Sequence, residues 1–145
     1  GEALAKHGIK FFYHNHGFEF VPHGEGTLFD LIVQETKPEL VTFEMDVFWT
    51  VHPGQDPVKL LKKYPNRWSL MHIKDMRKGT PTGKLTGSED VRNDVVVGSG
   101  QIDVVAALKA AHESTANGHR PTPFANAIGS VSIFSAWNWR SYSSL

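Results

Sequence analysis

The chain has 145 residues, the length of one ordinary domain with a buried core, and 40% of them are hydrophobic. Fifteen basic and fifteen acidic residues leave a formal net charge of zero, so no charge surplus favours nucleic acid or an anionic membrane as a partner. The chain has no cysteine, which excludes disulfides and thiolate zinc sites.

The sequence pattern predicts strands and helices that alternate along the first 113 residues. The predicted strands are residues 9–15, 40–49 and 68–75, with a short extended piece at residues 95–97. The predicted helices are residues 2–7, 28–36, 58–64 and 104–112.

Several residues mark where these helices begin and end. Gly8 is expected to close the first helix in a left-handed conformation, and Thr27 to cap the second. In the second helix, Leu28, Leu31 and Ile32 follow the helical period, so we expect them on its inward face. Asp56 followed by proline is a specific start signal for the third.

Strands and helices that alternate at a spacing of roughly 30 residues are typical of right-handed βαβ units around a parallel sheet. Three strands are too few for a complete domain of this kind. We therefore interpret residues 1–113 as part of a (β/α) barrel or of an open parallel sheet.

The last 32 residues, 114–145, differ in composition, because they contain no Asp, Glu or Lys. We interpret them as an atypical tail that is either translated out of frame or poorly ordered. Residues 130–135 still alternate in polarity and predict an opportunistic strand. The chain also lacks a starting methionine, so we expect a fragment; with no signal peptide or apolar span visible, we expect it in the cytoplasm.

Ionisable side chains gather where the three main strands are predicted to end. Side chains alternate along a strand, so each strand brings one pair to a single face: His14 with His16, Glu44 with Asp46, and His72 with Lys74. In a (β/α) barrel such residues point into the mouth where active sites are built.

Two interpretations of these pairs compete. A single histidine at a strand end is more often structural than a ligand, and Glu44 is placed to form a buried ion pair with Lys74 or Lys10. However, burying so many charges without partners costs several kcal/mol per charge. A divalent cation held by Asp46, His72 and a first-strand residue offsets that cost, and we favour this metal site.

Five motifs, in order, resemble the sugar phosphate isomerase/epimerase family, which belongs to the xylose-isomerase-like TIM barrels. They are residues 13–20 (YHNHGFEF), 43–49 (FEMDVFW), 71–76 (MHIKDM), 78–83 (KGTPTG) and 98–103 (GSGQID). The resemblance implies an α/β fold, a partial (β/α)8 TIM barrel that comprises about strands 5–7 with their helices. Residues 1–113 would be the C-terminal half of that barrel.

The resemblance also implies one divalent metal, often manganese, with Mg²⁺, Co²⁺ or Zn²⁺ as alternatives. Asp46 and His72 match two of the family's metal ligands, and His14 is favoured over Glu19 as the ligand from the first strand. At the other positions the resemblance implies substrate binding by His16, Glu44 and Trp49, and a part in catalysis for Glu19 and Lys74.

The implied chemistry is proton transfer next to the carbonyl of a small carbohydrate, through an enediolate, as in isomerases and epimerases of sugars or sugar phosphates. The family's fourth ligand, a glutamate after the last predicted helix, has no counterpart in residues 114–145. We therefore interpret the chain as truncated, and whether it is active stays open. We also expect it to self-associate through an exposed barrel edge.

Two other functions remain open. A chain without the fourth ligand could be a non-catalytic sugar- or metal-binding remnant of such an enzyme. The same barrel superfamily includes endonucleases that act at abasic DNA sites, but the neutral net charge disfavours that function.

Overall fold

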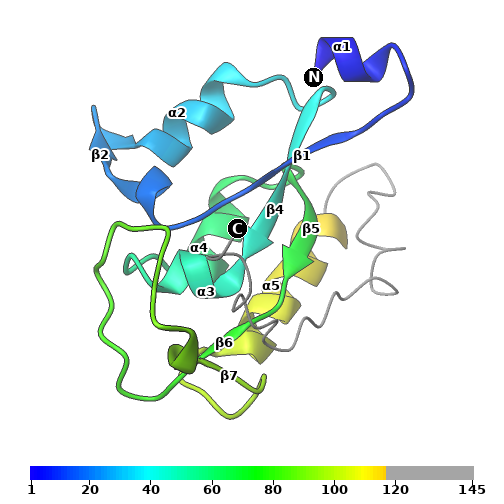
Figure 1. The fold of residues 1–145 in the computed structure, drawn as a ribbon. Helices are drawn as coiled ribbons and strands as arrows, with labels where there is room; N and C mark the ends of the chain where they lie inside the picture. Colours follow the sequence, from blue (N-terminus) through cyan, green and yellow to red (C-terminus); the bar gives the residue numbers. More distant parts are fainter. Residues whose placement is uncertain (117–145) are drawn as a thin grey trace, which may run out of the picture.

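The computed structural model describes residues 1–116, so the predictions made for residues 117–145 lie outside the described part. Helices and strands alternate along it (Figure 1). The helices are α1 (Glu2–Ala5), α2 (Leu28–Glu35), α3 (Val47–Val51), α4 (Pro57–Lys63) and α5 (Val104–Ala116). The strands are β1 (Phe11–His14), β2 (Pro22–His23), β3 (Gly26–Thr27), β4 (Val41–Asp46), β5 (Trp68–His72), β6 (Asp75–Met76) and β7 (Asp94–Val95). None of the helices in residues 1–116 has the length and apolar character that a membrane span requires.

The three longer strands form a parallel sheet in the order β1-β4-β5, which confirms the predicted α/β class. β2 pairs with β3, and β6 with β7, as two small antiparallel ribbons. Helices α4 and α5 pack side by side behind the sheet (Figure 1). The carboxyl ends of β1, β4 and β5 therefore meet at one edge of the sheet.

The main core lies between the sheet and the helices. Phe43 and Met45 point from β4 into this core, where Leu61 from α4 is also fully buried. Aromatic rings fill much of the remaining space, with Phe29 of α2 stacked on Trp68 of β5 at 5.5 Å between ring centroids. Burial of these large rings is the main stabilising contribution of the core.

The predicted inward face of α2 is only partly right. Ile32 packs against the main core as expected, but the buried apolar side chains of this helix are Phe29 and Val33, whereas Leu28 and Leu31 are only half-buried. The helical period fits both sets, so periodicity alone does not choose between them. The aromatic contacts of Phe29 with Phe20 and Trp68 decide the orientation, because they bury the larger area.

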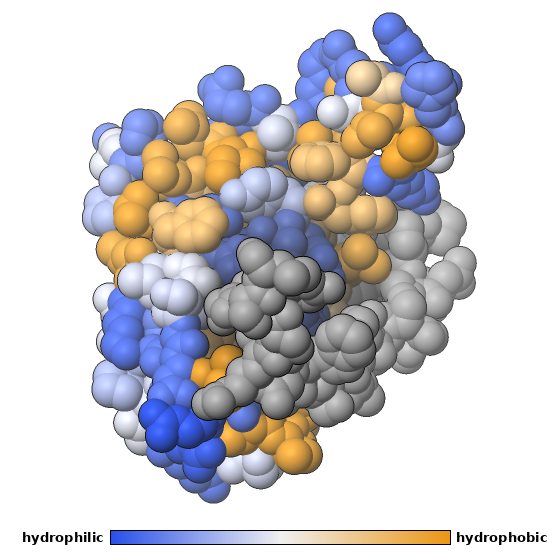
Figure 2. Space-filling model, viewed as in Figure 1, coloured by the Kyte–Doolittle hydropathy of each residue, from blue (hydrophilic) through white to orange (hydrophobic). Residues whose placement is uncertain are grey.

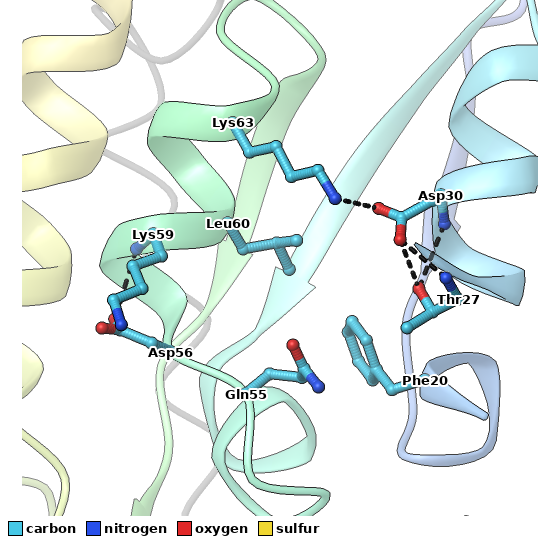
Figure 3. A pocket seen from close by; sticks show the side chains of 8 residues that line it. All are labelled: Phe20, Thr27, Asp30, Gln55, Asp56, Lys59, Leu60 and Lys63. Atoms are coloured by element: carbon cyan, nitrogen blue, oxygen red, sulfur yellow. Dashed lines mark hydrogen bonds and ion pairs between the residues drawn. The ribbon is translucent and has the colours of Figure 1, made fainter. Parts of the chain in front are cut away.

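The predicted N-caps of α2 and α4 are confirmed. Thr27 and Asp30 form a reciprocal capping box, and Asp56 accepts the backbone N–H groups of Val58 and Lys59. Asp30 also binds Lys63 Nζ at 2.8 Å, which ties α2 to α4 beside a small hollow of about 110 Å³ (Figure 3). Asp30 thus uses Oδ2 for the capping box of α2 and Oδ1 for the link to α4.

The second strand ends earlier than predicted. Residues 47–49 were expected to continue it, but β4 stops at Asp46 and α3 begins at once. The reason is the side chain of Asp46, whose Oδ1 accepts the backbone N–H of Trp49 at 3.0 Å and so caps α3. Trp49 therefore lies on a helix.

An irregularity in the pairing of β4 with β5 sets which side chains reach the far face of the sheet. Phe43 pairs with Trp68, but the next pair is Glu44 with Leu70. The extra residue, Ser69, shifts the alternation of β5 by one, so that His72 pairs with Asp46. Without this bulge, His72 would face the helices.

The third strand also ends earlier than predicted, at His72. Asp75 instead begins β6, is fully buried and accepts backbone N–H groups from Met76, Gly98, Gly100 and Ile102. A Cβ at Gly100 would lie 2.2 Å from Asp75 Oδ1, so this position requires glycine. The 98–103 motif is thus a backbone loop folded around one carboxylate.

Candidate metal centre

The structure brings together ionisable side chains from all three parallel strands. In the register of the sheet, His14 of β1 pairs with Glu44, and Asp46 of β4 pairs with His72. All of these residues stand at the carboxyl ends of their strands, the edge at which parallel α/β folds bind ligands. In the same view as Figure 1, hydrophilic atoms lie in the middle of the molecular face (Figure 2).

Asp46 is the centre of the cluster. Its side chain is fully buried, and its Oδ2 lies 3.3 Å from His14 Nε2, 3.1 Å from His72 Nδ1 and 3.0 Å from Lys74 Nζ. Its backbone N–H donates to Asn15 Oδ1 at 3.0 Å. Burial alone would raise the pKa of Asp46, but His14, His72 and Lys74 outweigh it and hold this pKa well below its usual range.

His14 connects Asp46 to a second carboxylate. Its Nδ1 lies 3.1 Å from Glu44 Oε2, and both side chains keep somewhat more than a quarter of their surface exposed. The hydrogen bond with Asp46 raises the pKa of His14, burial opposes this, and Glu44 adds to the rise. The centre therefore attracts positive charge, whether a proton or a metal ion.

The donor atoms are spaced as metal ligands are. One atom each from His14, Glu44 and His72 lie within 4.8 Å of one another. In addition, His72 Nε2 is buried and has no hydrogen-bond partner among residues 1–116. Imidazole nitrogens and carboxylate oxygens together suit zinc, manganese and related divalent cations. The residues present therefore fit a divalent metal: His14, Glu44 and His72 have the spacing of metal ligands, and the predicted ligand Asp46 lies against both histidines.

Aromatic rings border the cluster on one side. His16 lies 5.1 Å from His14 and 5.6 Å from Trp49 between ring centroids, and it stacks on Phe18 at 5.5 Å. Burial lowers the pKa of His16, and the neighbouring charge of His14 lowers it further. A neutral imidazole and an indole side by side can hydrogen-bond and stack on a polyhydroxylated ring, which is the role predicted for His16 and Trp49.

Glu19 lies apart from the other predicted metal-ligand candidates. It is 3% exposed, its Oε1 accepts the hydroxyl of Tyr13 at 2.9 Å, and its Oε2 accepts the backbone N–H of His16 at 2.9 Å. Burial, together with the charge of Glu19, raises the pKa of Tyr13 to about 12. In this conformation Glu19 holds the turn that follows β1 and makes no hydrogen bond to His14, Asp46 or His72.

The sequence interpretation missed one carboxylate near the centre. Asp94 begins β7 and pairs with Met76, just after the third strand. Burial raises the pKa of Asp94, and the charges of Lys74, Asp46 and His72 also act on it. The residue sits in the long polar loop after Met76, which has no periodicity that would have pointed to it.

Comparisons with known proteins extend this description. No protein-family model matches the chain. An inosose dehydratase of Clostridium perfringens is 33% identical over 124 residues, which are 81% of this chain and 41% of that protein. An inosose dehydratase of Geobacillus kaustophilus is 32% identical over 117 residues, 77% of this chain and 37% of that protein. The chain thus spans about two fifths of the length of the curated relatives it matches.

Solved structures with the same fold are also known. A sugar phosphate isomerase/epimerase from Parabacteroides distasonis superposes with a TM-score of 0.60 and 35% identity, covering 79% of this chain and 37% of that one. The IOLI protein, solved with a bound zinc atom, superposes with a TM-score of 0.58 at 22% identity, over 78% of this chain and 39% of that one. The parallel sheet and its helices are therefore part of a TIM barrel of the xylose-isomerase-like type.

Proposed function

Because the chain belongs to the sugar phosphate isomerase/epimerase family of xylose-isomerase-like barrels, we propose that it carries a divalent-metal centre for proton transfer next to the carbonyl of a carbohydrate. The observation that carries the proposal is the convergence of His14, His72 and Lys74 on the buried carboxylate of Asp46. A purely structural ion pair would not need ionisable groups from three strands.

The proposed metal ligands are His14, Asp46 and His72, with Glu44 as a further oxygen donor. A bound cation supplies polarisation of the substrate carbonyl and its neighbouring hydroxyl, which acidifies the C–H between them. We propose manganese, and the zinc atom in the IOLI structure supports a divalent cation more generally. The buried Nε2 of His72, which has no hydrogen-bond partner in the described part of the chain, is the nitrogen most clearly left over for such an ion.

The chain's other residues bind the substrate and stabilise charge. Lys74 is 19% exposed and brings its ammonium group to the edge of the centre, where it can donate to an oxygen that becomes negative as the proton leaves. His16 and Trp49 provide a hydrogen-bonding ring and a stacking surface beside it. These groups together hold a small polyhydroxylated ketone.

Two carboxylates compete for the role of proton acceptor. Glu19 is the residue that the family resemblance implies, but both of its oxygens are engaged by Tyr13 and the His16 backbone. Glu44 stands at the centre with 28% of its side chain exposed. The exposure of Glu44 favours it for contact with substrate, and Glu19 then supports the turn that carries His16.

The relatives suggest two outcomes of the same first step, which is removal of a proton next to the carbonyl. In an isomerase or epimerase, the proton returns to the other carbon or to the other face. In a dehydratase, which is the activity named for the curated relatives, the electron pair expels a β-hydroxyl group that leaves as water after protonation. The same donors and metal serve both reactions.

A deuterium-exchange experiment tests the proposal. The full chain is incubated in D₂O with Mn²⁺ and an inosose or a ketose, and the substrate is followed by proton NMR. We expect loss of the C–H signal next to the carbonyl, with or without further conversion. Metal binding without exchange would instead support a non-catalytic remnant, and absence of both would contradict the proposal.

A further inference from the structure

His52 is a buried polar residue that the proposed chemistry does not use. It follows α3, its side chain is fully buried, and its Nε2 lies 2.7 Å from Glu89 Oε2. Because an ionised carboxylate only accepts hydrogen bonds, His52 Nε2 is the donor. A charge-assisted hydrogen bond of this kind, with one partner fully buried, is among the stronger single contacts in a protein.

The same histidine also holds the backbone of the segment that leads to Glu89. Its carbonyl oxygen accepts the N–H groups of Gly83 at 2.8 Å and Lys84 at 3.3 Å. Lys84 Nζ then binds Glu89 Oε2 at 2.7 Å, which joins the two ends of the segment. Residues 83–89 are thus fastened to the end of α3 at both ends.

The middle of this segment touches the turn that carries His16. The N–H of Gly17 donates to the carbonyl oxygen of Thr86 at 3.1 Å, and a Cβ on Gly17 would lie 2.4 Å from that oxygen. A Cβ on Gly87 would lie 2.8 Å from the ring of Phe18. Phe18 in turn stacks on His16. The Gly17 contact is with backbone and therefore requires glycine, whereas a side chain at position 87 would have to displace the ring of Phe18.

The ring of His52 also contacts Trp49, another of the predicted substrate-binding residues. It packs edge-on against Trp49 at 5.2 Å between centroids and stacks on Phe48 at 5.8 Å. His52 therefore touches Trp49 directly and reaches His16 through residues 83–89. Neither His52 nor Glu89 contributes to the group of side chains with metal-ligand spacing.

We infer that the His52–Glu89 pair, joined by Lys84, is a positioning device that holds residues 83–89 against the turn after β1 and so orients His16 and Trp49 toward the substrate. The orientation of His16 and Trp49 toward a substrate rests on the proposed function, whereas the attachment of residues 83–89 to the turn does not. Loss of the pair should therefore weaken substrate binding and leave metal binding unchanged.

The test compares Glu89→Gln and His52→Gln with a matched control, Asp90→Asn. Asp90 lies in the same loop and forms an exposed ion pair with Arg92, away from His52. Amide hydrogen exchange of Gly17 and Gly83 reports directly on the two backbone contacts of the segment. We expect both amides to exchange about tenfold faster or more in Glu89→Gln and His52→Gln, and at the wild-type rate in Asp90→Asn.

Two binding measurements complete the test on the full chain. Mn²⁺ affinity should be the same in all variants, while KM for an inosose should rise in Glu89→Gln and His52→Gln. Exchange of the Gly17 and Gly83 amides at the wild-type rate in both variants would overturn the inference. A loss of Mn²⁺ affinity as large as the rise in KM would also overturn it. If the wild type turns over no inosose, the proposed function fails, but the exchange result still decides whether the pair holds the segment.

Discussion

His72 Nδ1 lies 3.1 Å from Asp46 Oδ2, although 26 positions separate the two residues in the chain and they stand on different strands. The contact exists because β4 and β5 are parallel and pair Asp46 with His72 in register. Asp46 thus has two roles, because its Oδ1 caps α3 while its Oδ2 is the candidate metal ligand. The stability of the fold and the proposed metal binding therefore share this residue.

The double role of Asp46 predicts different results for two substitutions. Asp46→Asn keeps a side-chain oxygen for the N–H of Trp49 but loses the negative charge, whereas Asp46→Ala loses both. In the absence of metal, we expect the Ala variant to be less stable than the Asn variant by about 1 kcal/mol. Denaturant unfolding measures the difference, and equal stability would show that the cap contributes nothing.

Lys74 should be needed for turnover but not for metal. Lys74→Met removes the ammonium group next to Asp46 while keeping most of the side-chain volume, so we expect proton exchange of the substrate to fall by roughly 10²–10⁴-fold. Mn²⁺ should still bind, because a positive neighbour has been removed. The exposed Lys62→Met serves as control. Loss of metal together with exchange would assign Lys74 a structural role.

The two candidate carboxylates can be told apart by substitution. Glu44→Gln should abolish substrate exchange with little loss of stability, because the side chain is partly exposed. Glu19→Gln should destabilise the fold by about 1–3 kcal/mol, because its amide cannot accept from both Tyr13 and the His16 N–H.

The pKa of the Tyr13 phenol gives an independent test of the role of Glu19. Burial and Glu19 raise its pKa to about 12, so Glu19→Gln should lower this pKa toward the ordinary value of 10.0. Ultraviolet absorbance of the phenolate follows the titration. If Glu19→Gln instead left Tyr13 and stability unchanged and abolished exchange, Glu19 would be the proton acceptor.

Asp30 predicts an acid-dependent part of the stability. Burial alone would raise its pKa, but hydrogen bonds from Lys63, Tyr64 and Thr27 lower it from 3.8 to about 2. A lowered folded-state pKa stabilises the fold above pH 3.8, and this contribution is lost as the pH falls from about 4 toward 2. The free energy of unfolding of the wild type should exceed that of Asp30→Asn, and this difference should be about 2 kcal/mol larger at pH 5 than at pH 2.

Urea unfolding at several pH values measures this difference. The control is Glu25→Gln, because Glu25 is an exposed carboxylate that lines a second hollow together with Asp30, Lys63 and Tyr64. A gap between wild type and Asp30→Asn that stayed constant from pH 5 to pH 2 would contradict the assignment.

The parts of the site that the sequence predicts are those set by strand periodicity. His14, Asp46 and His72 were placed together because alternation sorts side chains by face and parallel strands end at one edge. The position of His72 also depends on the bulge at Ser69, which the sequence did not predict. The extra residue shifts the alternation of β5 by one and so places His72 opposite Asp46.

The parts that could not be predicted come from long-range contacts of irregular backbone. His52 and Glu89 are 37 positions apart, and Glu89 lies in the polar loop after Met76, which has no repeating pattern. Asp94 reaches the centre through a two-residue ribbon. The start of α3 was missed for a different reason. Residues 47–51 are rich in β-branched and aromatic side chains that favour a strand, and the capping carboxylate of Asp46 overrides that preference.

Metal titration tests the central claim most directly. The full chain, stripped of metal, is titrated with Mn²⁺ and Zn²⁺ by calorimetry, in parallel with His72→Ala and with the exposed His23→Gln as control. We predict one bound divalent cation per chain, with affinity about 100-fold weaker or worse in His72→Ala and unchanged in His23→Gln. A wild-type chain that binds neither metal, or a His72→Ala variant that binds like wild type, would contradict it.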